Sequence, residues 1–244
     1  MRRITWVFIL FLALASMPAV AQQNFGSISF GTGIPQGDFG STEDLSNSGY
    51  ALTGGVIRFD GAYFPGSYLG IGGTFSFGSN YVERDSLLSD MITYIEENAS
   101  STVDIPEDAE ILYGSGFWNN INLLIGPQFA IRATQRLYFD FRALAGLTVL
   151  RFPDQELRIT YDGNEIYSVT SGNTLSFGFT TGVGLRYNLN SNIALKLAAD
   201  YYQTKAKYTY TFDLLQDLAT DVPPLDAEYY LRTVDFSIGL AYNF

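Results

Sequence analysis

The chain contains no cysteine and no histidine among its 244 residues. Without cysteine, neither a disulfide framework nor a thiol nucleophile is available. Without histidine, the Ser-His, Cys-His and histidine–metal chemistries are all absent. An aspartate-only or Ser-Lys mechanism stays conceivable, but no loop places a lysine beside a serine in a recognisable motif. The residue types therefore predict a protein that is not an enzyme and that has no catalytic, cofactor or metal site.

Positive charge is scarce as well. The 14 Lys and Arg residues are outnumbered by 25 Asp and Glu, which gives a formal net charge of −11. We expect no nucleic-acid partner, because nothing in such an acidic chain offsets the repulsion from phosphate groups. Long apolar runs are missing beyond the first 21 residues, so the sequence predicts no membrane-spanning helix.

Residues 1–21 have the pattern of a cleaved secretory signal. Arg2 and Arg3 precede an apolar run over 4–15, and Ala19-Val20-Ala21 provides the small residues of a cleavage site. The apolar run is too short for a comfortable membrane span. Cleavage would leave a single domain, residues 22–244, with a net charge of 12 − 25 = −13, because Arg2 and Arg3 are removed.

Aromatic residues and glycine, by contrast, are abundant, with 19 Phe, 17 Tyr and 24 Gly. They occur in segments where apolar side chains alternate with small or polar ones, which is the period of a half-buried strand. Eight segments show it: 25–33, 50–60, 68–79, 117–131, 137–150, 175–187, 193–212 and 229–244. Short connectors (61–67, 132–136 and 188–192) take turns with long ones (34–49, 79–116, 152–172 and 213–228).

A soluble sandwich also alternates, and it remains a third interpretation. Strict alternation of short and long connectors is instead typical of outer-membrane barrels, whose short connectors are periplasmic turns and whose long connectors are extracellular loops. The sequence therefore predicts an all-β, antiparallel, up-and-down transmembrane barrel, most simply of eight strands, in the outer membrane of a Gram-negative-type bacterium.

The 152–172 segment leaves ten strands open as an alternative. Asp162-Gly163 separates two alternating runs there, which is a strong hairpin signal. We expect this hairpin to continue the fifth and sixth strands beyond the membrane. It would then be a stiff loop or, less simply, an edge to which a partner strand could pair.

The last strand ends on an amphipathic face that resembles the signal read by the outer-membrane assembly machinery. Its apolar side chains are Phe236, Ile238, Leu240, Tyr242 and Phe244. With the secretory signal and eight strands, this ending resembles the small outer-membrane β-barrel superfamily, which includes the OmpA transmembrane domain and OmpX. The run Gly-Ile-Pro-Gln-Gly-Asp-Phe-Gly at 33–40 is similar to one common in the outer membrane protein beta-barrel domain group.

The resemblance implies a monomeric barrel. Unlike full-length OmpA, this sequence stops at its last predicted strand, so we expect no periplasmic peptidoglycan-binding domain. The resemblance also implies outer-membrane lipid, lipopolysaccharide and the assembly machinery as partners.

Several charged residues fall on the inward face of the predicted strands. They are Arg58, Asp60, Asp140, Arg142, Arg186, Lys196, Asp200 and Asp235, four basic and four acidic. Charges removed from water need partners, and this neutral set can supply them internally. An ion path or gate is one interpretation. We favour a salt-bridged plug, because eight strands leave room only for side chains or one small ligand.

The longest connector, 79–116, predicts a short helix. Leu87, Leu88, Met91, Ile92 and Ile95 recur at helical spacing, and Ser86 is the expected N-cap. The helix could form a lid over the barrel mouth or bind a partner. Amphipathicity by itself specifies only burial, so we expect packing against the barrel rim. The connector is rich in acidic residues, which usually form a solvated face, and none of them has the spacing of a calcium loop.

Two functions follow from these patterns. The leading hypothesis is a structural or interaction barrel with a plugged lumen and long acidic extracellular loops. The alternative is a narrow pore or a carrier for ions or small apolar solutes.

Overall fold

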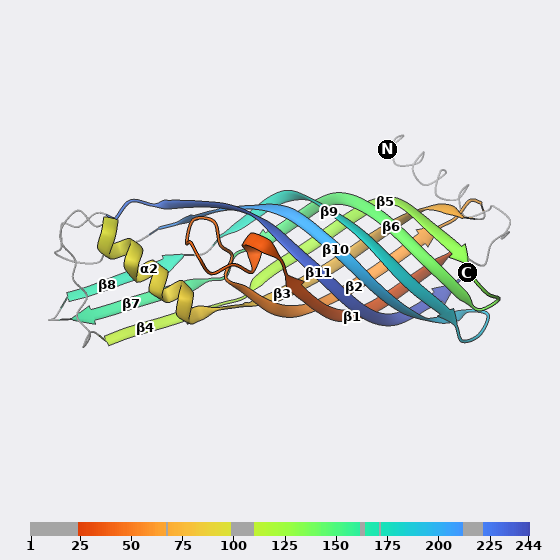
Figure 1. Cartoon of the computed structure of the whole chain (residues 1–244), viewed down its shortest axis with the longest axis horizontal. Coiled ribbons are helices and arrows are strands. Elements are labelled where there is room, and N and C mark those ends of the chain that lie inside the picture. The colour runs from red at the N-terminus through yellow and green to blue at the C-terminus, as the bar shows by residue number, and fades with distance from the viewer. Residues whose placement is uncertain (1–23, 67, 99–109, 162–163, 171, 212–221) are drawn as a thin grey trace, which may run out of the picture.

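The computed structural model describes residues 24–66, 68–98, 110–161, 164–170, 172–211 and 222–244. The expected secretory signal, 1–21, lies outside the described residues. Eight antiparallel strands close into a barrel in the order β1-β11-β10-β9-β6-β5-β3-β2 (Figure 1). Their bounds are β1 Phe25–Pro35, β2 Ala51–Tyr63, β3 Leu69–Val82, β5 Trp118–Arg132, β6 Leu137–Arg151, β9 Asn173–Asn188, β10 Ile193–Tyr210 and β11 Leu225–Asn243.

Closure of the barrel confirms the predicted eight strands and excludes ten. The first and last strands pair antiparallel from Phe25↔Asn243 to Pro35↔Thr233. Short turns join β2 to β3, β5 to β6 and β9 to β10, all at the end of the barrel where the chain terminates (Figure 1). We call this the short-turn end. The connectors at the opposite, long-loop end are all longer.

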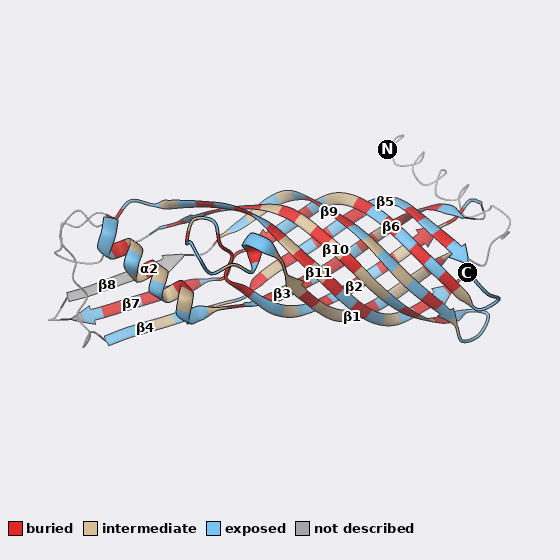
Figure 2. Cartoon of the chain, in the orientation of Figure 1, coloured by how far each residue is buried: buried red, intermediate tan, exposed pale blue. Residues whose placement is uncertain are grey.

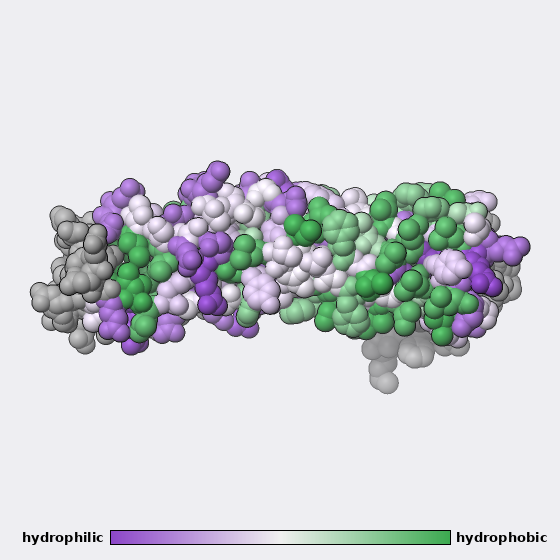
Figure 3. Space-filling model, turned by 60° about the horizontal axis from the view of Figure 1, so that its bottom comes forward, coloured by the Kyte–Doolittle hydropathy of each residue, from purple (hydrophilic) through white to green (hydrophobic). Residues whose placement is uncertain are grey.

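Alternation along each strand places one face in the lumen and the other outside (Figure 2). The five apolar residues of the expected assembly signal, four on β11 and Phe244 directly after it, are all exposed, from 50% at Phe236 to 61% at Phe244. Apolar side chains gather on the outer surface toward the short-turn end, and polar ones toward the long-loop end (Figure 3). The described residues include no helix long and apolar enough to cross a membrane.

A second sheet of three strands stands at the long-loop end, in the order β4-β7-β8. Its members are β4 Glu110–Ser115, β7 Gln155–Tyr161 and β8 Asn164–Thr170. The predicted hairpin is therefore present as β7 and β8, although its Asp162-Gly163 turn lies outside the described residues. Its expected continuity with the barrel strands was wrong. β7 pairs with the unpredicted β4, from Glu110↔Thr160 to Ser115↔Gln155, and so belongs to a separate sheet.

Two helical elements also lie at the long-loop end, the 3-10 turn η1 (Gly37–Phe39) and the helix α2 (Arg84–Asn98). Ser86 is not the N-cap, because the helix begins two residues earlier. The Glu83 carboxylate caps it instead, accepting a hydrogen bond of 2.8 Å from the Ser86 amide.

The apolar face of α2 is buried, as rim packing predicts. Leu87, Met91 and Ile95 are at most 1% exposed and join the hydrophobic cluster at this end of the molecule.

Candidate functional site in the barrel lumen

The structure places all eight predicted charged residues in the lumen, each between 0% and 9% exposed. They come from five strands: Arg58 and Asp60 on β2, Asp140 and Arg142 on β6, Arg186 on β9, Lys196 and Asp200 on β10, and Asp235 on β11. Each sits at an inward position between outward apolar residues. Strands far apart in sequence thus deliver opposite charges to one interior.

Six of these residues form a continuous chain of ion pairs across the barrel. Asp200 is its centre and accepts hydrogen bonds of 2.7 Å from both Nε and Nη2 of Arg142. Asp200 also forms an ion pair with Arg58, and Arg58 forms a second ion pair with Asp235. Arg142 donates to one oxygen of Asp60 at 2.7 Å, and Lys196 donates to the other at 2.5 Å. The order is Asp235–Arg58–Asp200–Arg142–Asp60–Lys196, with three anions and three cations.

The remaining pair, Arg186 and Asp140, lies nearer the short-turn end. Two hydrogen bonds of 3.1 Å join the guanidinium to both carboxylate oxygens, a bidentate geometry that favours arginine. The guanidinium also lies 4.1 Å from the ring centre of Phe25 and 5.2 Å from that of Tyr138. Aromatic faces attract a cation, so these rings compensate for part of the lost hydration.

Glycines on the facing walls make room for these side chains. A Cβ at Gly182 would lie 1.8 Å from an oxygen of Asp200, and one at Gly178 would lie 2.5 Å from the hydroxyl of Thr148. A Cβ at Gly72 would lie 2.3 Å from the amide oxygen of Gln128.

At three other glycines of the barrel strands, Gly70, Gly146 and Gly184, a Cβ would first meet strand backbone instead, at 2.4, 2.2 and 3.2 Å. At Gly178, Gly182 and Gly72, a polar group of the lumen thus occupies the space of the missing side chain.

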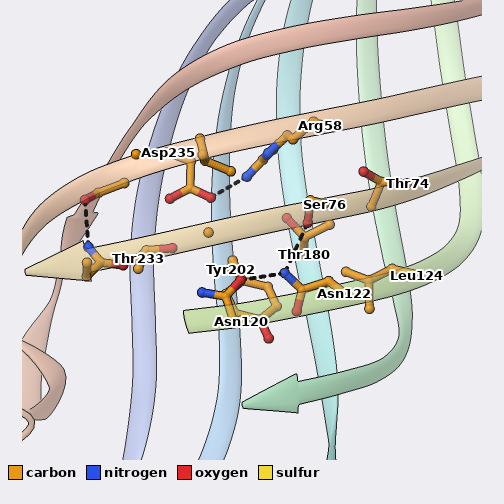
Figure 4. A pocket seen from close by; sticks show the side chains of 15 residues that line it. Arg58, Thr74, Ser76, Asn120, Asn122, Leu124, Thr180, Tyr202, Thr233 and Asp235 are labelled. Carbon is orange, nitrogen blue, oxygen red and sulfur yellow. Dashed lines mark hydrogen bonds and ion pairs between the residues drawn. The ribbon is translucent and has the colours of Figure 1, made fainter. Parts of the chain in front are cut away.

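A small polar cavity of about 20 Å³ lies on the long-loop side of the ion-pair chain, with Arg58 and Asp235 in its wall (Figure 4). Asn122 donates hydrogen bonds to Ser76 at 3.0 Å and to Asn120 at 2.8 Å. Sequence reasoning missed this layer, because amides and hydroxyls are ordinary residues on an inward strand face. Only their mutual hydrogen bonds, which depend on barrel geometry, mark them as a unit.

A third layer consists of aromatic side chains and lies on the long-loop side of the cavity. Trp118 is its centre, with ring centres 5.5 Å from Phe39, 5.0 Å from Phe152 and 5.9 Å from Tyr229. Its indole N–H donates to the carbonyl of Gly49 at 2.8 Å. The buried face of α2 packs against the same cluster. The helix and the aromatic side chains together form one hydrophobic cluster at the long-loop end.

Tyr50 connects the first long connector to α2. It is 1% exposed and adopts the left-handed conformation, with φ of 50°. A bulky residue there costs about 1–2 kcal/mol, so surrounding contacts must hold it. Its hydroxyl donates to the Asp90 carboxylate on the helix. Burial and this hydrogen bond both raise the pKa of Tyr50, which lies outside the membrane-spanning segments and therefore stays neutral.

Among the described residues, no group of three or more acidic side chains is arranged to hold a metal ion. The arrangement consists of a paired charge layer, a small polar cavity and an aromatic layer. Its chemistry is that of a filled interior.

A family model described as outer membrane protein beta-barrel domain matches residues 7–244. The chain belongs to this family. It is therefore an outer-membrane barrel whose apolar outer face contacts lipid. By the rule for such barrels, the short-turn end faces the periplasm and the long-loop end faces the exterior. A search of curated proteins found no match.

Several solved structures are similar. Ail, the attachment invasion locus protein of Yersinia pestis, is 14% identical with a TM-score of 0.39, covering 91% of this chain and 99% of its own. OprG from Pseudomonas aeruginosa is 15% identical with a TM-score of 0.49, covering 91% and 95%. The outer membrane protease OmpT from Escherichia coli is 9% identical with a TM-score of 0.45, covering 94% and 99%. At these identities and TM-scores, the likeness carries no information about the task of this chain.

Proposed function

We propose that the protein is a non-enzymatic structural or interaction barrel whose lumen is permanently filled. The observation that carries this proposal is the space left inside. The lumen cavity measures about 20 Å³, and a single water needs about 10–15 Å³. An ion path would need a continuous file of water through the charge layer and the aromatic layer. The paired charges instead occupy that space and neutralise one another.

The interaction part of the proposal rests on the extracellular end. The outer face of α2 exposes Asp85, Glu96 and Glu97, while its apolar face is buried. Such a face suits a basic partner surface, or lipopolysaccharide phosphates bridged by divalent cations. We further propose that the barrel is a monomer, and that the apolar outer face of β11 serves as its assembly signal.

Planar-bilayer conductance of the refolded protein tests the sealed lumen. The wild type should be silent. Replacement of residues 84–99 by a short Gly-Ser linker should also be silent, because the charge layer remains. Adding Arg142→Ser, Asp200→Ser and Trp118→Ala to that deletion, which removes side chains from both the charge layer and the aromatic layer, should open a conducting path. Steady conductance from the wild type without a partner would contradict the proposal.

One observation favours the alternative, a narrow pore or carrier. The Nε of Arg58 and the hydroxyl of Thr74 are buried beside the cavity and have no hydrogen-bond partner among the described residues. At about 20 Å³ the cavity holds one water, and a small polar solute could bind these two groups only if the cavity widened. Uptake into liposomes, compared with empty liposomes across ions and small lipophilic solutes, separates the two functions. Uptake above background would support the carrier.

A further inference from the structure

The lipid-facing surface of the barrel contains a groove of about 920 Å³ across five neighbouring strands, β6, β9, β10, β11 and β1. Its floor is set by strand register. One row of outward positions consists of Phe141, Val183, Ala199, Phe236 and Thr32. Ala199 is the smallest side chain of this row and lies between Val183 and Phe236. The groove therefore arises where a small residue lies in a row of larger ones.

Different residues flank the groove on its extracellular and periplasmic sides. The next outward residue of β10 toward the exterior is Tyr201, whose ring centre lies 6.3 Å from that of Phe179 on β9. These two rings lie beyond the lining residues of the groove, on its extracellular side. Toward the periplasm, the adjacent outward row is apolar, from Phe139 through Leu197 to Phe30, and leads to the short turns.

The charge at the periplasmic end is unlike that of the rest of the chain. Arg136 is the single charged residue in the three short turns 64–68, 133–136 and 189–192, although the net charge of the chain is −11. Its side chain is exposed, and the described residues offer its guanidinium no ion pair. The neighbouring Arg132 uses its guanidinium to bind turn carbonyls, those of Thr134 and Gln135.

We propose that Arg136 and the groove together bind one anionic phospholipid of the periplasmic leaflet. The guanidinium would contact the phosphate, and one acyl chain would occupy the groove below Tyr201. Arg136 precedes Phe139 by three residues and Phe141 by five, which is about 10 and 17 Å along a strand at about 3.3 Å per residue. One leaflet contributes about 15 Å of hydrocarbon, so an acyl chain extends past Phe139 toward the row that contains Phe141 and Ala199.

This site lies on the outer wall and does not depend on whether the lumen is sealed. The groove should hold a lipid, because in an outer-membrane barrel this outer surface faces the hydrocarbon of the membrane. The charge selects the headgroup, because an unpaired arginine at the periplasmic interface favours a net negative lipid over a zwitterionic one.

Native mass spectrometry of the folded protein in detergent tests the proposal. The two probes are dioleoylphosphatidylglycerol and dioleoylphosphatidylcholine, which share their acyl chains and differ in net charge. The wild type should retain one phosphatidylglycerol about fivefold more strongly than phosphatidylcholine, the factor expected for one arginine at a membrane surface. R136Q should lower phosphatidylglycerol retention to that of phosphatidylcholine.

The groove is tested separately from the charge. A199F fills the floor and should lower retention of both lipids about tenfold, the loss expected when roughly two methylenes lose their contacts. A143F is the matched control, because Ala143 is also outward and exposed but does not line the groove. A199L repeats the test with a smaller side chain, and heat-modifiable migration on gels verifies folding of every variant.

Two results would overturn the proposal. The first is equal retention of the two lipids by the wild type. The second is equal retention by A199F and A143F, which would mean that lipid adheres to the whole barrel surface and not to the groove.

Discussion

Asp200 is the residue whose replacement should reveal most about the filled lumen. Its side chain is fully buried and accepts hydrogen bonds from two arginines, Arg58 and Arg142. Asp200→Asn preserves the shape but leaves three cations facing two anions in the ion-pair chain. Removing one partner from a buried ion pair typically costs about 3–5 kcal/mol, because the remaining charge is desolvated without compensation. We expect a loss of this size in the free energy of unfolding.

Guanidinium titration in detergent micelles, followed by heat-modifiable gel migration, measures this loss. Asp154→Asn provides the control. Asp154 pairs with Arg151 at the same 2.7 Å that separates Arg142 from Asp200, but the side chains of that pair are 53% and 63% exposed. Exposed pairs contribute less than about 1 kcal/mol. Equal losses in the two variants would refute the reasoning and indicate that water reaches the charge layer.

A double variant separates the ion pairs from the general cost of mutating the lumen. Asp200→Asn combined with Arg142→Gln restores a neutral chain of two anions and two cations. The double loss should be smaller than the sum of the single losses, by about 0.5–3 kcal/mol, because the two residues contact each other. Strict additivity would mean that their ion pair contributes nothing.

Three further variants test other layers. Gly182→Ala should lower the free energy of unfolding by about 1–3 kcal/mol through overpacking, whereas Gly26→Ala, which meets no atom within 4 Å, should change it little in the same titration. Met91→Ala should lower the stability of α2 packing at the long-loop end by about 2–5 kcal/mol. Proteolysis of α2 should therefore be faster than in the exposed control Thr93→Ala. The hydrogen bonds that Glu83 accepts from the first turn of α2 hold its pKa below its usual 4.5, so this cap stabilises the helix above that pH and is lost as the pH falls. Hydrogen exchange in the first turn, corrected for the intrinsic rate, should therefore rise on acidification in the wild type and vary little with pH in Glu83→Gln.

Strand number and boundaries could be predicted from sequence because the wall of the barrel follows a local period of two. The segment predicted at 137–150, for example, is β6, Leu137–Arg151. The same period identified which charges face the lumen. It could not show which cation meets which anion. Those contacts join side chains across the interior, and they depend on strand tilt and stagger rather than on any local pattern.

The second sheet shows the same limit. β4 has only six residues and lies within a connector that otherwise predicts a helix and a solvated acidic run. Its pairing with β7 is a tertiary contact, so no local signal could assign it. The misplaced helix cap has a simpler cause. Serine is a common N-cap, but here the helix begins at Arg84, so Ser86 lies in the first turn and its own amide donates to the Glu83 side chain.

The ion-pair chain also determines how the barrel can fold. Arg58 and Asp235 are separated by 177 residues, and Asp60 and Lys196 by 136. These pairs join β2 to β11 and β10, which lie on either side of the β1–β11 seam. A sheet that has not yet closed would leave these charges unpaired at its two edges, at a high cost in an apolar surrounding. Seam closure and charge pairing should therefore occur as one cooperative step, and because the contacts are so distant in sequence, that step should be slow.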